Sequence, residues 1–160
     1  MARIYISLGS NINREANLRG AVHELNAALG PLLLSSVYES EAVGFVGDAF
    51  YNMVIGADTS LDVSAVVSLC KQIEDKFGRV RDGIKYCGRS LDLDLLTYDQ
   101  LICTEPVELP RAEILQNAFV LQPLAELAPE TLHPEVQQTY GALWQAYKVP
   151  QKLWAIPFKF

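Results

Sequence analysis

The alternation of helix-like and strand-like segments is the feature of this sequence that most limits its fold. From about Arg14, apolar residues recur at spacings of four, three and four positions: Leu18, Val22, Leu25 and Leu29. This spacing places them on one face of a helix, and the Gly-Pro pair that follows marks its end. The segment is therefore predicted to be an amphipathic helix that buries one side.

A second amphipathic helix is expected to begin near residue 60, where Ser60 or Asp62 can cap its first turn. Its apolar stripe has helical spacing and consists of Val63, Val66, Cys70, Ile73 and Phe77. Gly78 favours termination of the helix, because glycine adopts the left-handed conformation that ends many helices.

Apolar runs with strand character lie before, between and after the two helices. We expect strands at residues 2–8, 32–40, 50–58 and 91–98, and the run 101–103 is a candidate for a short fifth strand. The order β-α-β-β-α-β is that of the ferredoxin-like split βαβ arrangement. The sequence therefore predicts an α/β fold of the α+β type, with a mainly antiparallel sheet.

The C-terminal part reads as additional helical pieces. Two apolar segments, RAEILQNAFVLQPLAELAP and TYGALWQAY, carry most of its hydrophobic residues, and prolines punctuate it. Helices from this part would cover the second face of the sheet, so we expect extra C-terminal helices and helices on both faces. We expect residues 1–160 to form a single domain, because this length suits one hydrophobic core.

Composition narrows the class of protein. Half of the residues are hydrophobic and 20% are charged, as in ordinary soluble domains. No segment approaches the roughly 20 apolar residues that span a bilayer. The opening MARIYISLGSN lacks the apolar stretch and cleavage site of a signal peptide. We expect a cytoplasmic monomer with no membrane partner.

Cysteine and histidine usage excludes several kinds of site. The three cysteines are 17 and 16 residues apart with no CxxC pair, which argues against a disulfide framework and a thiolate zinc site. The two histidines lie far apart in the sequence, which argues against a histidine metal site or catalytic triad. Any metal is therefore expected to be a hard cation held by carboxylates, such as magnesium.

The charge distribution indicates a specific anion site. The net charge is −6, whereas a general nucleic-acid binder is usually basic, so we expect no nucleic-acid partner. Residues 79–89 nevertheless carry four basic residues against one acidic residue, a local charge of +3. The basic residues of this loop are Arg79, Arg81, Lys85 and Arg89. A positive loop on an acidic protein suits a small anion such as phosphate.

Two aspartates interrupt the apolar run LDLDLL. If this run is a strand, its side chains alternate, so Asp92 and Asp94 project from one face and the leucines from the other. Their Cα atoms would be roughly 6.5 Å apart, from a rise of about 3.3 Å per residue. Two carboxylates at this spacing can converge on one cation or bracket two, as in sites of phosphoryl transfer.

The alternative interpretation is a half-exposed strand with two solvated aspartates, and for an isolated DxD we would favour it. The basic loop changes this balance because it runs directly into the strand. Arginine offers planar, bidentate donors for phosphate oxygens, while paired carboxylates hold magnesium. Loop and strand together therefore favour a magnesium–nucleotide site.

Other polar and aromatic residues have both structural and functional interpretations. Glu74 could pair with the arginines or hold a nucleotide hydroxyl, although alone it suits a surface position. Asn52 could read a heterocycle through its amide, or satisfy a neighbouring loop. Phe50 shares the face of Asn52, and Phe119 suits either the core or an aromatic clamp. GSN at 9–11 is expected to be a structural turn that can also touch a ligand.

An ordered set of motifs resembles a known family. The motifs are GSN near the start, then YESEAVGF, FYNMV, IEDKFGRVR, GRSLDLDLLTYD, and LP followed by FVLQPLAELAPE. They resemble the 6-hydroxymethyl-7,8-dihydropterin pyrophosphokinase family of the folate pathway, from about residue 3 to about residue 145. The family's fold is a ferredoxin-like domain with flanking helices, consistent with the order of segments above.

The resemblance implies an activity and a set of site residues. The family transfers the pyrophosphoryl group of ATP to the hydroxymethyl oxygen of the pterin and releases AMP. The implied metal ligands for two Mg²⁺ ions are Asp92 and Asp94, which are expected to be catalytic together with Arg79 and Arg89. Implied contacts to the co-substrate ATP are Glu74, Arg79, Arg81, Tyr86, Arg89 and Arg111. Implied pterin contacts are Ser40, Val43, Gly44, Phe50, Asn52 and Phe119.

Five positions depart from the family's pattern. They are Ala42, Cys87, Gly88, Arg111 and Asn117. These changes leave open an alternative, a divergent paralogue that binds pterin or nucleotide with weak, altered or no pyrophosphokinase activity. RNA-binding modules share the same order of elements, but the aromatic segment that they use on RNA does not occur here.

Overall fold

The computed structural model describes residues 1–40, 49–78, 91–149, 151 and 153–160. Its strands are β1 (Ala2–Ser10), β2 (Leu33–Leu34), β3 (Val37–Ser40), β4 (Phe50–Thr59), β5 (Asp92–Tyr98) and β6 (Leu153–Ile156). Its helices are α1 (Arg14–Leu29), α2 (Val63–Gly78), α3 (Glu113–Gln116), α4 (Ala118–Leu127) and α5 (Tyr140–Ala146). None of the helices within these ranges is long and apolar enough to cross a membrane.

The strands form one sheet in the order β5-β1-β4-β3-β6, and β2 also pairs with β4. Each pairing in the described part of the chain is antiparallel. Up to β5 the chain order is β-α-β-β-α-β, with the second β position divided between two short strands. The predicted ferredoxin-like α+β fold is confirmed.

The predicted strand 32–40 is wrong as a single element, because the structure divides it into β2 and β3. Ser35 lies between them and donates its backbone N–H to the carbonyl of Val54. The Ser35 hydroxyl accepts the N–H of Val54 at 2.9 Å. A side chain therefore takes the place of a ladder carbonyl, so the chain stays on β4 while the regular strand is interrupted.

The prediction of a short strand at 101–103 is also wrong. Cys103 forms only an isolated bridge with Leu109. The structure instead has a strand that was not predicted, β6, which pairs with β3 and forms the edge of the sheet opposite β5. Its four residues form a short apolar run near the chain end, too brief to show a clear alternation.

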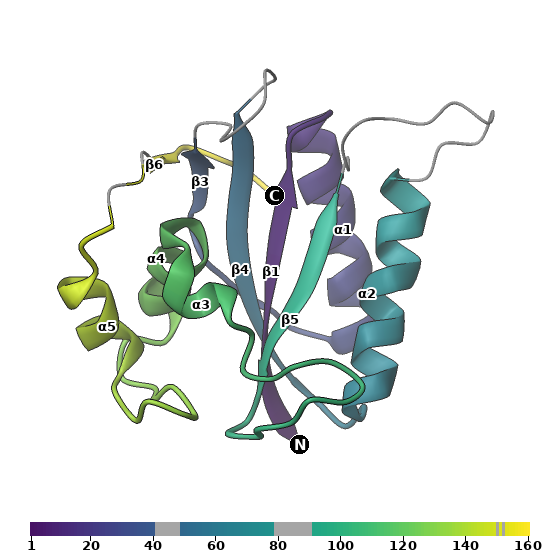
Figure 1. Cartoon of the computed structure of the whole chain (residues 1–160). Coiled ribbons are helices and arrows are strands. Elements are labelled where there is room, and N and C mark those ends of the chain that lie inside the picture. Colours follow the sequence, from purple (N-terminus) through teal and green to yellow (C-terminus); the bar gives the residue numbers. More distant parts are fainter. Residues whose placement is uncertain (41–48, 79–90, 150, 152) are drawn as a thin grey trace.

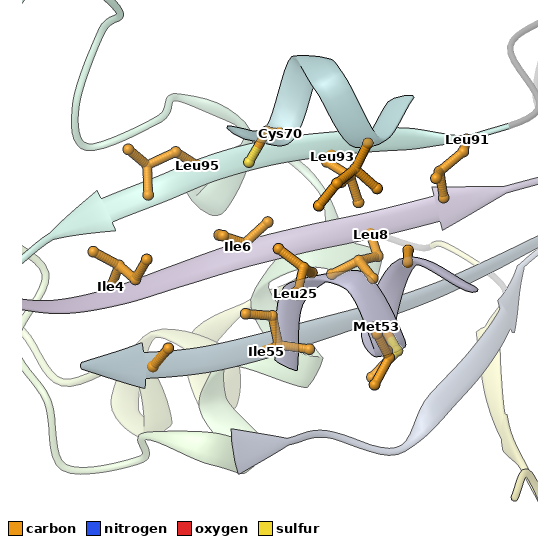
Figure 2. Packing of buried hydrophobic residues seen from close by; sticks show 14 of the residues in the cluster. Ile4, Ile6, Leu8, Leu25, Met53, Ile55, Cys70, Leu91, Leu93 and Leu95 are labelled. Atoms are coloured by element: carbon orange, nitrogen blue, oxygen red, sulfur yellow. The ribbon is translucent and has the colours of Figure 1, made fainter. Parts of the chain in front are cut away.

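Helices α1 and α2 cover one face of the sheet (Figure 1). Figure 2 shows the apolar side chains that pack between these helices and the sheet, including Ile6, Leu25 and Cys70. The helices approach each other closely at Gly20, where an added Cβ would lie 2.4 Å from a ring carbon of Phe77. Asp62 caps α2 by accepting the N–H of Ala65 at 2.8 Å, one of the two predicted caps.

Helices α3, α4 and α5 lie on the opposite face of the sheet (Figure 1). Their core contains Tyr5, Val54 and Leu96 from the sheet together with Leu124 of α4 and Tyr140 of α5. The prediction of helices on both faces is confirmed, and the extra C-terminal helices supply the second layer.

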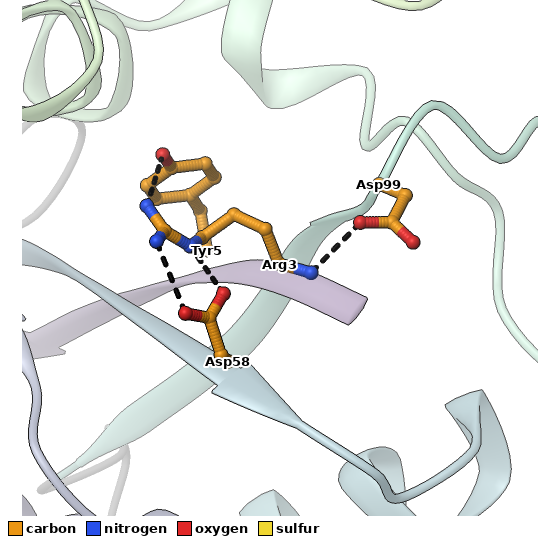
Figure 3. Close-up of polar contacts among 4 residues, drawn as sticks. All are labelled: Arg3, Tyr5, Asp58 and Asp99. Atoms are coloured by element: carbon orange, nitrogen blue, oxygen red, sulfur yellow. Dashed lines mark hydrogen bonds and ion pairs between the residues drawn. The ribbon is translucent and has the colours of Figure 1, made fainter. Parts of the chain in front are cut away.

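At one end of the sheet, Arg3 of β1 forms polar contacts with β4 and with the turn after β5 (Figure 3). Its side chain binds Asp58 of β4 through Nε–Oδ1 at 2.7 Å, and its backbone N–H donates to Asp99 after β5. The hydrogen bond from Arg3 lowers the pKa of Asp58. Both side chains of the ion pair are about half exposed, so water screens the attraction and the pair adds little to stability.

His133 is buried in the turn that precedes α5 and accepts hydrogen bonds from its backbone. The side chain is 1% exposed, and its Nδ1 accepts the backbone N–H groups of Glu135 and Val136 at 3.1 and 3.3 Å. Burial lowers the pKa of His133, against a smaller opposing effect of Glu135. The neutral imidazole is therefore the form that fits the fold.

We expect the free energy of unfolding to decrease as the pH falls below about 6.5, because the unfolded chain then binds a proton that the folded chain resists. Urea unfolding at pH 7.5 and pH 5.5 measures this loss. His133→Asn keeps an acceptor for the turn without a titrating ring, so its loss over the same interval should be smaller. Equal losses in the two proteins would contradict this role of His133.

Candidate active site

Strand β5 presents its two aspartates on one face. Leu91, Leu93 and Leu95 are 2–4% exposed and belong to the core beneath α1 and α2. Asp92 and Asp94 alternate with them and are half-buried on the opposite face. The predicted alternation is confirmed: the leucines bury the strand, and this fixes the direction of both carboxylates.

The central strand β1 places Asp92 in line with Asn52 of β4. Gly9 pairs with Asp92 on one side and with Asn52 on the other, and Ser7 pairs with Asp94. An added Cβ on Gly9 would lie 3.1 Å from Oδ1 of Asn52. The absence of a side chain at Gly9 therefore leaves open space between the amide and the carboxylates.

Asn52 is held in a fixed orientation. Its side chain is buried, and its Nδ2 donates to the hydroxyl of Ser40 at 2.9 Å. Ser40 is itself buried at the end of β3, in register with Phe50. A buried amide tied to a buried hydroxyl is a rigid group for recognising a polar ligand.

A cavity of about 280 Å³ lies over these residues. It brings together seven of the residues singled out from the sequence: Ser40, Phe50, Asn52, Asp92, Asp94, Arg111 and Phe119. These residues come from β3, β4, β5, α4 and the segment before α3, so tertiary folding alone collects them. Its acidic groups come from β5 and the start of α3, which we call the acidic side; its amide and its two aromatic rings come from β4 and α4, which we call the amide side.

Arg111 lies against the acidic side of this cavity. Its Nη2 is 3.5 Å from Oδ1 of Asp94, and its Nη1 is 3.5 Å from Oε2 of Glu113. Its Nε donates to the carbonyl of Leu95 at 3.3 Å. The guanidinium is thus held between β5 and α3, where it partly balances the carboxylate charge.

Glu74 occupies a different position from the other predicted residues. It lies on α2, and its Oε2 accepts the backbone N–H of Leu93 at 2.8 Å on the edge strand β5. A second cavity of about 140 Å³ lies here, and it shares Asp94 and Arg111 with the first. The two cavities therefore meet at the same carboxylate and guanidinium.

Cys70 also lines the second cavity, but its thiol is unsuited to nucleophilic chemistry. Burial, assisted by the charges of Glu74 and Asp94, raises the pKa of Cys70 to about 12. The thiolate is the reactive form of cysteine, so the thiol of Cys70 packs in the core and stays protonated near neutral pH.

Six predicted contact residues lie outside the described residues: Val43, Gly44, Arg79, Arg81, Tyr86 and Arg89. The departures Ala42, Cys87 and Gly88 lie there as well. Ser40 precedes the first of these gaps, and Asp92 lies one residue beyond Leu91, which follows the second; Ser40 and Asp92 both line the first cavity.

Sequence patterns missed four residues of the first cavity: Ser7, Leu8, Glu113 and Val120. Gly9 also lines it, and the segment GSN was expected to be able to touch a ligand. The turn predicted at GSN is wrong for its first two residues, because β1 continues through Ser10. Gly9 therefore lies within a central strand, and its register with β4 and β5 places it in the cavity. In the sequence, Glu113 could have been suspected only because it lies two residues after Arg111, with which it forms an ion pair.

The fold and the cavity define a ferredoxin-like α+β domain with an amide, two aromatic rings, paired carboxylates and an arginine around one small-molecule site. A family model narrows this class. The model of 7,8-dihydro-6-hydroxymethylpterin-pyrophosphokinase (HPPK) matches residues 5–129, and the chain belongs to this family.

Curated relatives agree with the family model. A 2-amino-4-hydroxy-6-hydroxymethyldihydropteridine pyrophosphokinase of Bacillus subtilis is 40% identical over 150 residues, which cover 88% of this chain and 89% of that protein. A protein of the same name from Aquifex aeolicus is 34% identical over 137 residues, covering 84% and 85%.

Solved structures show the same fold. A crystal structure of a Plasmodium falciparum HPPK-DHPS triple mutant matches with a TM-score of 0.74 at 16% identity. The match covers 91% of this chain but only 44% of that longer chain. At this identity the similarity supports the fold.

Proposed function

We propose that the protein transfers the pyrophosphoryl group of ATP to the hydroxymethyl group of 6-hydroxymethyl-7,8-dihydropterin, giving the pterin diphosphate and AMP in folate biosynthesis. Family membership and the names of the relatives support this activity. The observation that carries it is the cavity in which the carboxylates of Asp92 and Asp94 face an amide and two phenylalanines.

The amide side of the cavity suits the pterin. A pterin is a flat heterocycle with donors and acceptors along its edge, and Asn52 offers both kinds of group in a fixed orientation. Phe50 and Phe119 line the same cavity and supply faces for stacking. The volume of about 280 Å³ suits a small ring system.

The acidic side of the cavity suits magnesium. Within the described ranges, no group of three or more aspartate, glutamate, histidine or cysteine residues gathers to hold a metal. Two carboxylates are nevertheless what Mg²⁺ uses, because it keeps several waters and takes the remaining ligands from phosphates. We assign Asp92 and Asp94 to two Mg²⁺ ions, which when bound would neutralise the triphosphate of ATP and polarise its phosphoryl oxygens.

Arginines complete the proposed phosphate site. Arg111 is already held 3.5 Å from Asp94, so its guanidinium adds positive charge next to the proposed metal position. Arg79, Arg81 and Arg89 are assigned to the phosphates by family resemblance, and Tyr86 and Glu74 to the nucleotide. The last assignment fits the cavity beside Glu74, which meets the pterin cavity at Asp94.

The reaction then depends on positioning and charge. The hydroxymethyl oxygen attacks the β-phosphorus, the bond from that phosphorus to the α,β-bridging oxygen breaks, and AMP leaves. The hydroxyl proton passes to solvent. Asn52 and the two rings orient the oxygen, while the arginines stabilise the charge that develops on the phosphoryl oxygens. A dedicated general base is not required by this scheme.

We further propose that the protein works as a single-domain monomer in the cytoplasm. Both substrates are small molecules, so catalysis needs no macromolecular partner. Light scattering coupled to size-exclusion chromatography tests the oligomeric state: one chain mass supports the proposal, and twice that mass contradicts it.

The divergent-paralogue alternative rested on sequence departures. Two of the five departures, Arg111 and Asn117, lie in the described part of the chain, and of these two Arg111 lines the cavity. Its guanidinium lies 3.5 Å from Asp94 and suits phosphate binding. No observation in the described part of the chain favours loss of the activity.

Phosphorus NMR tests the proposed reaction. With magnesium, ATP and 6-hydroxymethyl-7,8-dihydropterin, we expect one AMP and one pterin diphosphate for each ATP consumed. Formation of ADP would indicate transfer of a single phosphoryl group, and an unchanged spectrum would indicate a binding protein. Either result would contradict the proposed function.

A further inference from the structure

The residues that follow α5 make contacts on both sides of the proposed pterin cavity. They lie beyond residues 5–129, the part matched by the family model. Three of their features matter here: Tyr147, Gln151 and the strand β6 (Leu153–Ile156), which we call the C-terminal brace. Figure 1 shows α5 beside α4 and β6 beside β3.

The first contact is at the beginning of α4, the helix that carries Phe119. The first N–H groups of a helix have no partner within the helix and need one from elsewhere. Asn117 precedes α4, but its side chain makes no capping hydrogen bond. Instead, Oε1 of Gln151 accepts the N–H of Ala118 at 2.7 Å. A glutamine 33 residues away therefore caps the turn on which Phe119 lies.

The second contact holds the end of the preceding helix. The hydroxyl of Tyr147 donates to the carbonyl of Gln116, the last residue of α3, at 2.6 Å. The ring of Tyr147 stacks on Trp144 at 5.7 Å. Between these two contacts Asn117 is extended, which separates α3 from α4. The brace thus holds the junction between α3 and α4, from which Phe119 reaches the cavity.

The third contact is with the opposite wall of the cavity. Strand β6 pairs with β3, and Leu153 is in register with Ser40. Ser40 in turn accepts the hydrogen bond that orients Asn52. Gln151, which contacts the helix that carries Phe119, is therefore only two positions from Leu153, which pairs with the strand that orients Asn52.

The end of the chain anchors this brace to α1. The carbonyl of Lys159 accepts a hydrogen bond from Nε of Arg19 at 2.8 Å. The guanidinium of Arg19 lies 4.7 Å from the ring centroid of Phe158. Phe158 also meets Tyr51 of β4 edge to face at 6.2 Å. The segment is thus held at both ends, which lets it transmit a fixed spacing.

We propose that the C-terminal brace sets the distance between α4, which carries Phe119, and the strands β3 and β4, which carry Ser40 and Asn52, with Gln151 as a positioning residue for Phe119. The proposal rests on the proposed function and deepens it. Because Gln151 is not among the residues around the acidic side, its effect should fall on the pterin and spare the nucleotide.

Binding measurements on three variants test this role. Gln151→Ala removes the acceptor, Gln151→Glu keeps an acceptor and adds a charge that a helix N-terminus favours, and Gln145→Ala changes an exposed glutamine of α5. Titrations use hydroxymethyl dihydropterin in the presence of magnesium and a non-hydrolysable ATP analogue. We expect Gln151→Ala to raise the Kd for the pterin about tenfold, with that of the analogue unchanged. Gln151→Glu should restore wild-type affinity.

Hydrogen exchange of the amides of residues 118–121 provides a second measurement that needs no ligand. Faster exchange confined to these amides in Gln151→Ala supports the brace. Exchange equal to that of Gln145→Ala, or equal weakening of both ligands, would overturn it. If the wild-type protein binds no pterin, the proposed function fails, and the exchange result still decides whether the brace exists.

Discussion

Substitution of Asp92 or Asp94 by alanine or asparagine is expected to reduce the rate of AMP formation by about 10³-fold or more, equivalent to about 4 kcal/mol of transition-state stabilisation. Both carboxylates face the cavity, and no third acidic ligand group gathers with them in the described ranges. Each carboxylate is therefore expected to supply a large share of the affinity for magnesium, and a neighbouring residue should not replace it.

These variants should fold almost normally. Both side chains are half-buried on the cavity face, while the leucines that alternate with them hold the strand in the core. Thermal unfolding should change by only a few degrees. Asp75→Asn, on the exposed side of α2, is the matched control and should leave the rate unchanged. Turnover near the wild-type value in either Asp92→Asn or Asp94→Asn would contradict the metal assignment.

Substitution of Asn52 by alanine is expected to lower kcat/KM for the pterin by 10²- to 10³-fold, since unpaired polar groups on ligand and protein are costly in a closed cavity. The KM for ATP should stay within twofold, because the nucleotide side is built from other residues. Ser40→Ala removes the hydroxyl that orients Asn52 and keeps the amide itself, so it should cost about tenfold.

Steady-state kinetics with each substrate varied in turn separates these effects. Asn26→Ala, on the exposed face of α1, removes the same amide away from the cavity and is the control. If Asn52→Ala and Asn26→Ala gave the same kcat/KM for the pterin, Asn52 would not recognise the ring. A parallel loss for both substrates would indicate general damage to the fold.

Local patterns were sufficient for the main elements of the fold. The spacing of Leu18, Val22 and Leu25 predicted α1 because burial of that stripe agrees with the tertiary structure. The alternation in LDLDLL predicted the direction of Asp92 and Asp94 for the same reason. In both cases the pattern of apolar side chains predicts which face is buried, and the direction of the polar side chains follows from that pattern.

Long-range pairing explains what the sequence did not reveal. Strand β6 pairs with β3 more than a hundred residues earlier, and nothing in LWAI indicates that partner. Ser35 ends β2 through a bond to Val54, which depends on the sheet already being formed. Gly9 joins the cavity because β1 lies between β4 and β5 in one particular register.

The site residues show the same limit. Asn52 was a candidate from its polar character in an apolar strand, but its bond to Ser40 depends on the pairing of β3 with β4. Glu74 was assigned to the nucleotide by resemblance, and the structure adds a contact with the backbone of β5. The residue types indicated which groups could bind a ligand, whereas the contacts that orient these groups depend on the folded structure.

A crystal structure of the complex with magnesium, α,β-methylene-ATP and 6-hydroxymethylpterin tests the central claim most directly. A methylene group stands in place of the α,β-bridging oxygen, whose bond to the β-phosphorus breaks in the reaction, so the complex is trapped before transfer. We predict magnesium bound to Asp92 and Asp94, the pterin between Phe50 and Phe119, and its ring edge hydrogen-bonded to Asn52. A pterin bound outside this cavity, or magnesium held without either aspartate, would contradict the account.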